Sequence, residues 1–234
     1  MTKKPLRTAI CTTVLALLAG CGNSGSYGGT APGPGPAQGA SFTTNFTGTE
    51  APISEGGAWQ HRGLDWTAVT KVNGFAHGTQ TGNGSYDDSY AYLSGFPANQ
   101  SASATIVLNT SATDANTREA ELLLRWSDAD HSATGYEINV HYLGDYVQIV
   151  KWIGPFGMFT ELLSVTPPKP KTGDVFKATI VGNVITVFYN NTQIAQATDV
   201  INPYTTGNPG MGFFIRAPAA NTDFGFSSFT ATGL

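Results

Sequence analysis

Two neighbouring stretches, 136–143 and 146–153, carry side chains suited to sugar recognition. Alternate positions provide a carboxylate, two amides, an imidazole and two aromatic rings: Glu137, Asn139, His141, Tyr146, Gln148 and Trp152. An indole offers an apolar plate for the C–H face of a pyranose, and oriented polar groups can bond its hydroxyls. These residue types therefore favour carbohydrate binding.

A hairpin would place these side chains on one face of a sheet. Residues 144–145 are Gly-Asp between two alternating runs, which is typical of a two-residue hairpin loop. In that register Trp152 lies opposite Glu137, and Gln148 lies opposite His141. The other alternate set is mostly apolar and is predicted to face the core: Tyr136, Ile138, Val140, Tyr142, Val147, Ile149, Lys151 and Ile153.

The stretch 119–127 extends the polar face if it pairs with the hairpin. Glu119, Glu121 and Arg125 alternate with an apolar set that ends at Trp126. A solvated outer face of a β-sandwich is the competing interpretation, because such a face is expected to be polar and a single exposed ring needs no ligand.

Two further clusters could contribute to binding. Residues 59–66 place two Trp, a His, an Arg and an Asp in an expected loop, which forms either one end of a groove or, as we favour, a structural plug. Asp87, Asp88, Asp199 and Asp223 could supply oxygen ligands to Ca²⁺, but their spacing is unlike an EF-hand loop, so solvated turns are expected. We therefore predict no metal and no cofactor.

Common catalytic motifs are missing from the sequence. The four histidines lack the HxxxH and HExxH spacings of zinc enzymes. No Gly-x-Ser-x-Gly elbow and no phosphate-binding loop occurs.

The elements that must position these residues are short strands. Alternating runs separated by Gly, Asn, Asp and Pro predict an all-β sandwich or barrel over residues 41–234. Residues 175–181, 184–189 and 192–197 are expected to form a three-strand meander through tight turns. Further strands are expected at 43–47, 89–93, 102–108, 119–126, 158–165, 211–216 and 224–231.

The charge balance argues against nucleic acid as a partner. Three of the 12 basic residues precede position 21, whereas all 16 acidic residues follow it. Phosphate binding needs basic clusters, which the remaining chain lacks.

The N-terminus predicts export and lipid anchoring. Residues 1–20 combine a basic start with a 13-residue apolar run, too short to span a membrane. Leu18-Ala19-Gly20-Cys21 resembles the lipobox of bacterial lipoproteins, which implies that Cys21 is lipidated and holds the protein in the cell envelope, at the outer membrane in a Gram-negative cell. An ordinary signal peptide with a chance cysteine is the alternative. Residues 21–40 are rich in Gly and Pro and read as a linker.

The C-terminal part of the sequence resembles concanavalin A-like lectin/glucanase domains of the LamG-like type. The resemblance rests on residues 181–199, with Gly-Asn and Asn-Asn turns, on Pro209-Gly-Met-Gly-Phe213 and on the closing strand 224–231. It implies a jelly-roll β-sandwich of two curved antiparallel sheets, with ligand on the concave face.

The resemblance leaves three functions open, because this fold serves lectins, hydrolases and lyases alike. A glucanase motif Glu-x-Asp-x-x-Glu is incomplete at 119–121, and an alginate-lyase motif Gln-(Ile/Val)-His is only approximated at 139–141. The favoured hypothesis is a membrane-anchored glycan-binding domain without catalytic residues. The alternatives are a polysaccharide lyase or glycoside hydrolase that uses His141, Glu121 and Arg125, and a structural envelope lipoprotein.

Overall fold

The computed structural model describes residues 39–111 and 116–234 of the 234-residue chain. The predicted signal peptide, Cys21 and nearly all of the predicted linker lie outside the described residues. No helix within the described ranges is long and apolar enough to cross a membrane.

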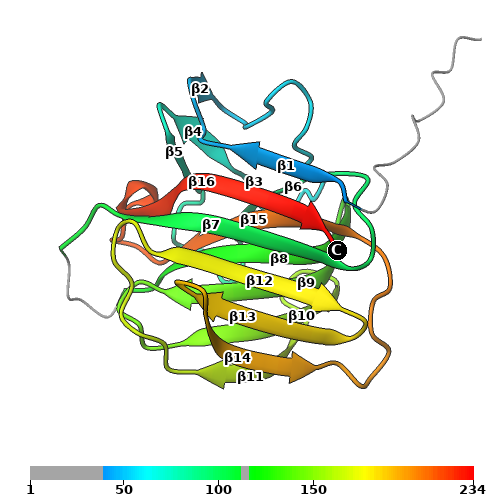
Figure 1. The fold of residues 1–234 in the computed structure, drawn as a ribbon. Coiled ribbons are helices and arrows are strands. Elements are labelled where there is room, and N and C mark those ends of the chain that lie inside the picture. Colours follow the sequence, from blue (N-terminus) through cyan, green and yellow to red (C-terminus); the bar gives the residue numbers. More distant parts are fainter. Residues whose placement is uncertain (1–38, 112–115) are drawn as a thin grey trace, which may run out of the picture. The chain divides into compact units, whose positions relative to one another are not determined.

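The described residues fold into two β-sheets that face each other, drawn as front and back layers in Figure 1. The nine-stranded sheet contains β1 (Ser41–Thr44), β2 (Thr49–Glu50), β4 (Thr70–Val72), β5 (Phe75–His77), β7 (Gln100–Leu108), β12 (Val175–Val181), β13 (Val184–Tyr189), β14 (Thr192–Thr198) and β16 (Phe224–Gly233). The seven-stranded sheet contains β3 (Thr67–Ala68), β6 (Ser89–Tyr92), β8 (Arg118–Ala129), β9 (Ser132–His141), β10 (Val147–Gly154), β11 (Phe159–Val165) and β15 (Asn208–Ile215). A single 3₁₀ turn, η1 (Asn221–Asp223), precedes β16.

The prediction of an all-β jelly-roll sandwich is confirmed. The seven-stranded sheet runs in the order β11-β10-β9-β8-β15-β6-β3, and the meander β12-β13-β14 forms one edge of the other sheet. We expected both sheets to be antiparallel. The pairing of β3 with β6 is parallel, so the seven-stranded sheet differs from that prediction at this edge. The short strands β2 to β5 were not predicted, because two or three residues are too few to show a period-2 pattern.

The core lies between the sheets and is filled by alternate residues of each strand. Tyr136, Ile138 and Val140 of β9 are fully buried there, as the alternation predicted. They pack with rings from the nine-stranded sheet, such as Phe226 and Phe229 of β16. Burial of such side chains stabilises a fold by about 1.5–3 kcal/mol each.

The register of the β9–β10 hairpin differs from the prediction by two residues. Glu137 pairs with Val150, and Gln148 pairs with Asn139. The loop is therefore longer than two residues, with Gly144 at φ 79° and its N–H bonded to the carbonyl of His141. A shift of two conserves the face of every side chain, so the predicted polar face survives while its direct pairs change.

A β-bulge at Arg125 overturns the predicted face of the end of β8. Arg125 has φ 49°, and the register with β9 shifts between Leu124 and Ser127. The extra residue reverses the alternation, because a one-residue slip moves side chains to the opposite face. Trp126 therefore lies on the outer face of the seven-stranded sheet, while the Arg125 guanidinium bonds the carbonyl oxygens of Ala98 and Tyr204 away from that face.

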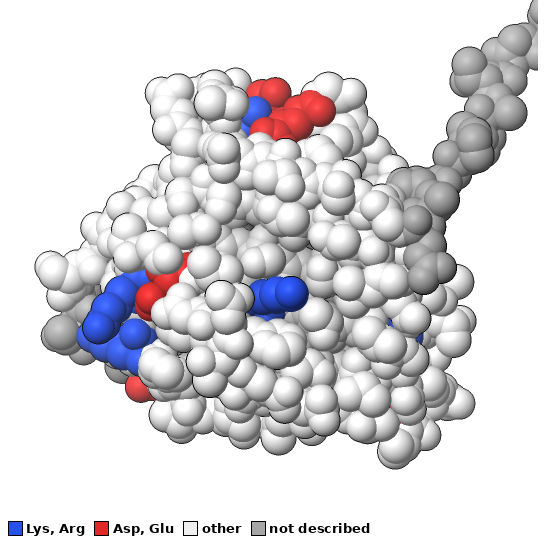
Figure 2. Space-filling view, in the orientation of Figure 1, with Lys and Arg blue, Asp and Glu red and all other residues white. Residues whose placement is uncertain are grey.

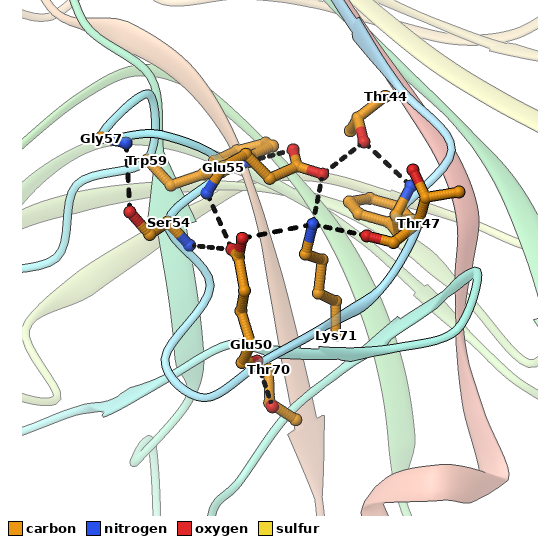
Figure 3. Close-up of polar contacts among 10 residues, drawn as sticks. Thr44, Thr47, Glu50, Ser54, Glu55, Gly57, Trp59, Thr70 and Lys71 are labelled. Carbon is orange, nitrogen blue, oxygen red and sulfur yellow. Dashed lines mark hydrogen bonds and ion pairs between the residues drawn. The ribbon is translucent and has the colours of Figure 1, made fainter.

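The buried side chain of Lys71 bonds the segment that precedes residues 59–66, the loop expected to act as a structural plug (Figure 3). Lys71 of β4 donates to the Thr47 carbonyl at 2.8 Å and to Glu55 at 3.0 Å, and its ammonium lies 3.6 Å from Glu50. Glu55 also accepts a 2.8 Å bond from the indole of Trp59. This network holds Trp59 in the core, where it meets Phe229 edge to face. The plug prediction is thus met at Trp59.

The outer face of the nine-stranded sheet is largely uncharged. Figure 2 views the domain from this side and shows Lys, Arg, Asp and Glu in only a few places. Hydroxyl and amide side chains bond one another across the strands in the pairs Thr43–Thr230, Thr105–Ser228 and Thr186–Gln196.

Candidate functional site

A pocket opens on the outer face of the seven-stranded sheet. Its volume is about 210 Å³. Strands β6, β8, β9, β10, β11 and β15 and the segments beside them supply its walls, so all the lining side chains come from one sheet surface. The lining residues are Tyr86, Asp88, Thr117, Glu119, Glu137, Asn139, Tyr146, Gln148, Val150, Trp152, Phe159, Phe214 and Arg216.

Trp152 forms a buried wall of this pocket. Its side chain is 2 % exposed and belongs to an aromatic cluster with Trp66 and Trp126, at centroid distances of 5.8 and 6.3 Å. Its indole N–H donates to Glu137 at 2.6 Å. The predicted contact between these two residues is therefore present, although they are diagonal rather than opposite neighbours in the register. A ring so enclosed has no free face for stacking on a sugar.

Two exposed rings at the pocket can take that role. Tyr86 is 44 % exposed and Phe159 is 37 % exposed, and their centroids lie 5.1 Å apart, edge to face. Phe159 also packs on Trp152 at 5.6 Å. The exposed platform of the pocket is thus held by the buried tryptophan behind it.

The polar lining includes three carboxyl groups in a poorly solvated setting. Burial raises the pKa of Glu119 to about 7, although Tyr146 donates a short hydrogen bond to it. Burial also raises the pKa of Glu137 despite hydrogen bonds from Trp152 and from Asn139, the latter at 3.0 Å. Burial, followed by repulsion from Glu137 and Glu119, holds the pKa of Asp88 well above its usual range.

Glu121 lies on the same face and completes an acidic group with Asp88, Glu119 and Glu137. In the register it lies opposite Asn139 on one side and Gly212 on the other. A side chain at position 212 would overlap the Glu121 carboxyl, so the glycine makes room for it. Burial, and then the charge of Glu137, raises the pKa of Glu121 well above its usual range. One oxygen of Glu121 is buried without a hydrogen-bond partner.

The structure brings five of the predicted site residues together in the pocket lining: Glu137, Asn139, Tyr146, Gln148 and Trp152. Glu121 is 1 % exposed beside it. His141 is 4 % exposed and is stacked beneath Tyr146 at 4.9 Å, outside the lining, where burial lowers its pKa. Arg125 is absent from the pocket because of the bulge described above. His141, Glu121 and Arg125 therefore do not converge as a catalytic set.

Six lining residues lie outside the predicted polar face: Tyr86, Asp88, Thr117, Phe159, Phe214 and Arg216. Asp88 belongs with Asp87 to a pair that we interpreted as a solvated turn, and Tyr86 directly precedes this pair. The concentration of Tyr and Asp just before a buried strand was the available signal. Phe214 and Arg216 reach the pocket only because β15 lies between β8 and β6, an order that the sequence does not reveal.

The proposed Ca²⁺ ligands do not gather. Asp199 is 2 % exposed and pairs with Lys151 at 2.6 Å, Asp223 pairs with Arg118 at 2.7 Å, and Asp88 lies in the pocket. Asp199 and Asp88 are therefore buried rather than in solvated turns. Over residues 39–111 and 116–234, no group of three or more His, Cys, Asp or Glu is arranged to hold a metal ion.

Comparison with known proteins establishes the fold. No known family model matches the sequence, and no curated protein is detectably similar to it. The exoplasmic/lumenal domain of VIP36, in its Ca²⁺/Man3GlcNAc-bound form, has a TM-score of 0.54 at 11% identity over 78% of this chain and 86% of that one. The carbohydrate-binding module CBM66 from Bacillus subtilis has a TM-score of 0.50 at 17% identity over 70% and 95%.

This chain has the concanavalin A-like jelly-roll fold. The Crh5 transglycosylase, in its apo form, shares the fold with a TM-score of 0.50 at 12% identity over 88% of this chain and 89% of that one. Identities this low describe architecture alone, so function has to be inferred from the pocket of this concanavalin A-like domain.

Proposed function

We propose that this domain binds glycan in the pocket on the outer face of the seven-stranded sheet. The main support is that one pocket is lined by both exposed rings and amide side chains. The rings are those of Tyr86 and Phe159, and the amides are those of Asn139 and Gln148. Rings accept the apolar face of a sugar, and amides and carboxyls bond its hydroxyls in fixed directions. A volume of about 210 Å³ suits one sugar ring, with the other sugar units of the glycan outside the pocket.

The structural neighbours add support at the level of architecture. CBM66 is a carbohydrate-binding module, and VIP36 holds Man3GlcNAc in the structure compared. The same architecture in this chain surrounds a pocket with sugar-binding chemistry.

Glycan binding at these rings is tested by Phe159→Ala and Tyr86→Ala. Each removes an exposed ring without opening the core, so the fold should persist while glycan affinity falls about 5- to 100-fold. Phe188→Ala, on β13 of the opposite sheet, removes a partly exposed ring far from the pocket and should leave affinity unchanged. Affinity measured on a glycan array that is equal in all four proteins would contradict this site.

A glycoside hydrolase is the second candidate, favoured by the raised pKa of Glu119, about 7, in a site with other carboxyl groups. A carboxyl that stays protonated near neutrality suits a general acid, with a second carboxylate as nucleophile or base. A reducing-end assay separates the candidates: hydrolysis requires new reducing ends that disappear in Glu119→Gln, whereas a binding domain produces none. A lyase has less support, because the acidic group would repel a uronate polymer.

We also infer that the protein is anchored in the cell envelope through a lipid on Cys21, at the outer membrane in a Gram-negative cell. Support comes from the basic start, the apolar run and the lipobox-like residues 18–21. Cys21→Ser should yield unacylated protein that no longer sediments with membranes, as judged by mass spectrometry and fractionation. An acyl-free N-terminus in the unchanged protein would refute the anchor, and a structural envelope role predicts an anchored protein without glycan affinity.

A further inference from the structure

The acidic group has very little positive charge to balance it. Its four carboxyls come from three parts of the sheet: Asp88 before β6, Glu119 and Glu121 on β8, and Glu137 on β9, with β15 between β8 and β6. Across the described ranges, no lysine or arginine forms an ion pair with any of the four. One oxygen of Glu121 is buried without a hydrogen-bond partner, and Asp88 lies nine-tenths buried in the pocket lining.

Other charged groups around the pocket balance it only in part. Arg216 lines the pocket and its charge favours ionised Glu119, but burial outweighs this effect, and its guanidinium lies over the ring of Phe214 at 5.5 Å. Glu161 of β11 adds negative charge at the rim, where it accepts a 2.7 Å bond from Gln148. His141 stays neutral because burial lowers its pKa, and Asp87 adds a further carboxyl beside Asp88.

A buried carboxylate without a counter-ion is costly, and a cationic ligand removes that cost. The exposed rings of Tyr86 and Phe159 border the same space. Aromatic faces attract ammonium groups, and carboxylates bond them strongly. The site therefore offers two independent attractions to one positive group.

We propose that the pocket selects a sugar that carries a protonated amine, with the ammonium group among Asp88, Glu119 and Glu137 and the sugar ring against Tyr86 and Phe159. The proposal rests on the proposed glycan-binding function and narrows it to amino sugars.

The proposal predicts that affinity for an amino sugar depends on pH and that binding releases protons. Glu119 holds its proton up to about pH 7 in the free protein, and burial raises the pKa of Asp88 and Glu137 as well. An ammonium group favours their ionised forms, so binding releases protons. Affinity for an amino sugar should rise as pH increases through about 7, until the amine itself loses its proton. A neutral sugar gains nothing from this ionisation, so its affinity should not rise.

The experiment compares three versions of the same oligosaccharide, with an amino, an acetamido or a hydroxyl group at C2, in both gluco and galacto series. Calorimetry with the purified protein at about pH 6 and about pH 7.5 measures affinity and proton release. We expect the amino version to bind at least about tenfold more tightly than its partners, and more tightly at the higher pH. Equal or tighter binding of acetamido or hydroxyl versions would overturn the amine proposal and leave glycan binding intact. Binding of no version would overturn both.

Asp88→Asn tests the acidic group with little change of shape. It should weaken the amino version about tenfold and leave any acetamido or hydroxyl binding unchanged. Asp130→Asn makes the same substitution at an exposed position outside the pocket and controls for the change from carboxyl to amide. Equal effects of the two variants on the amino version would overturn the proposal, and Glu137→Gln provides a second variant if Asp88→Asn does not fold.

Discussion

Trp152 supports the wall of the pocket and does not offer a free ring face to a ligand. Its ring is enclosed by other aromatic rings, and its N–H donates a hydrogen bond to Glu137. Removal of the Trp152 ring is therefore expected to lower the stability of the fold, and to affect glycan affinity only as a consequence. Trp152→Ala should destabilise the fold by about 3–5 kcal/mol, the usual cost of emptying a buried aromatic site. Chemical denaturation measures this directly.

Trp152→Phe is the matched control, since it keeps a ring but loses the donor to Glu137. A smaller loss is expected from it than from Trp152→Ala. If Trp152→Ala folds as stably as the unchanged protein and only loses glycan, the ring acts as an exposed platform and the enclosed geometry is wrong.

Glu119 predicts a decline of stability as the solution changes from weakly acidic to neutral. Its pKa is about 7 in the folded state, above the usual value of 4.5. The folded protein therefore binds more protons than the unfolded chain between these values. This stability contribution is fully present below about pH 4 and is lost as pH rises through about 7, amounting to about 1–3 kcal/mol. The melting temperature should fall between about pH 5 and pH 7.

Glu119→Gln should flatten that decline, because the amide does not ionise. Some slope should remain, since Asp88, Glu121 and Glu137 also have raised pKa values. A melting temperature that stays level or rises over this range in the unchanged protein would contradict the shifted pKa.

At the residue scale, alternation identified the polar face correctly but not the exposure of its members. Residues 137, 139 and 148 reach the pocket as expected because face is a local property of a strand. Trp152 was expected to be open to solvent and is enclosed by Trp66, which comes from a distant loop. Long-range packing of this kind leaves no trace in a local pattern.

At the element scale, one bulge decides what β8 contributes. The prediction treated residues 119–126 as a regular strand, and a regular strand would have put Arg125 on the same face as Glu121. The positive φ of a non-glycine residue carries no sequence signature, so Arg125 was assigned to the wrong face. The bulge therefore removes one cation from the face that carries the pocket.

The segment around Lys71 offers a second test at this scale. Burial alone would raise the pKa of Glu55, but bonds from Thr44, Trp59 and Lys71 lower it. Lys71→Ala leaves Glu55 and Glu50 without their cation, so we expect a loss of about 3–5 kcal/mol in the free energy of unfolding.

Asp65→Asn is the comparison for Lys71→Ala. It breaks the ion pair with His131, whose side chain is 70 % exposed, and should cost less than about 1 kcal/mol. Denaturation curves that place both variants within the same small range would show that the lysine network does not hold the plug.

For the whole molecule, burial and strand pairing must provide all the stability. Both cysteines, at positions 11 and 21, precede the sandwich. Residues 41–234 alone should therefore fold cooperatively, with a β-type circular dichroism spectrum that is the same with and without reductant. Substantial helix, or melting that depends on residues 22–40, would contradict this domain boundary.

β1, the first strand of the sandwich, is the element to which a pulling force on the N-terminal side of the domain would first be applied. β1 is joined to β16 by only four residue pairs, from Ser41–Thr232 to Thr44–Phe229, and it belongs to the sheet opposite the pocket. Tension applied through residue 41 while the pocket grips a ligand would cross both layers, and β1 would be the first strand to bear it. In a pulling experiment this strand should separate at low force, while the remaining strands still hold the pocket together.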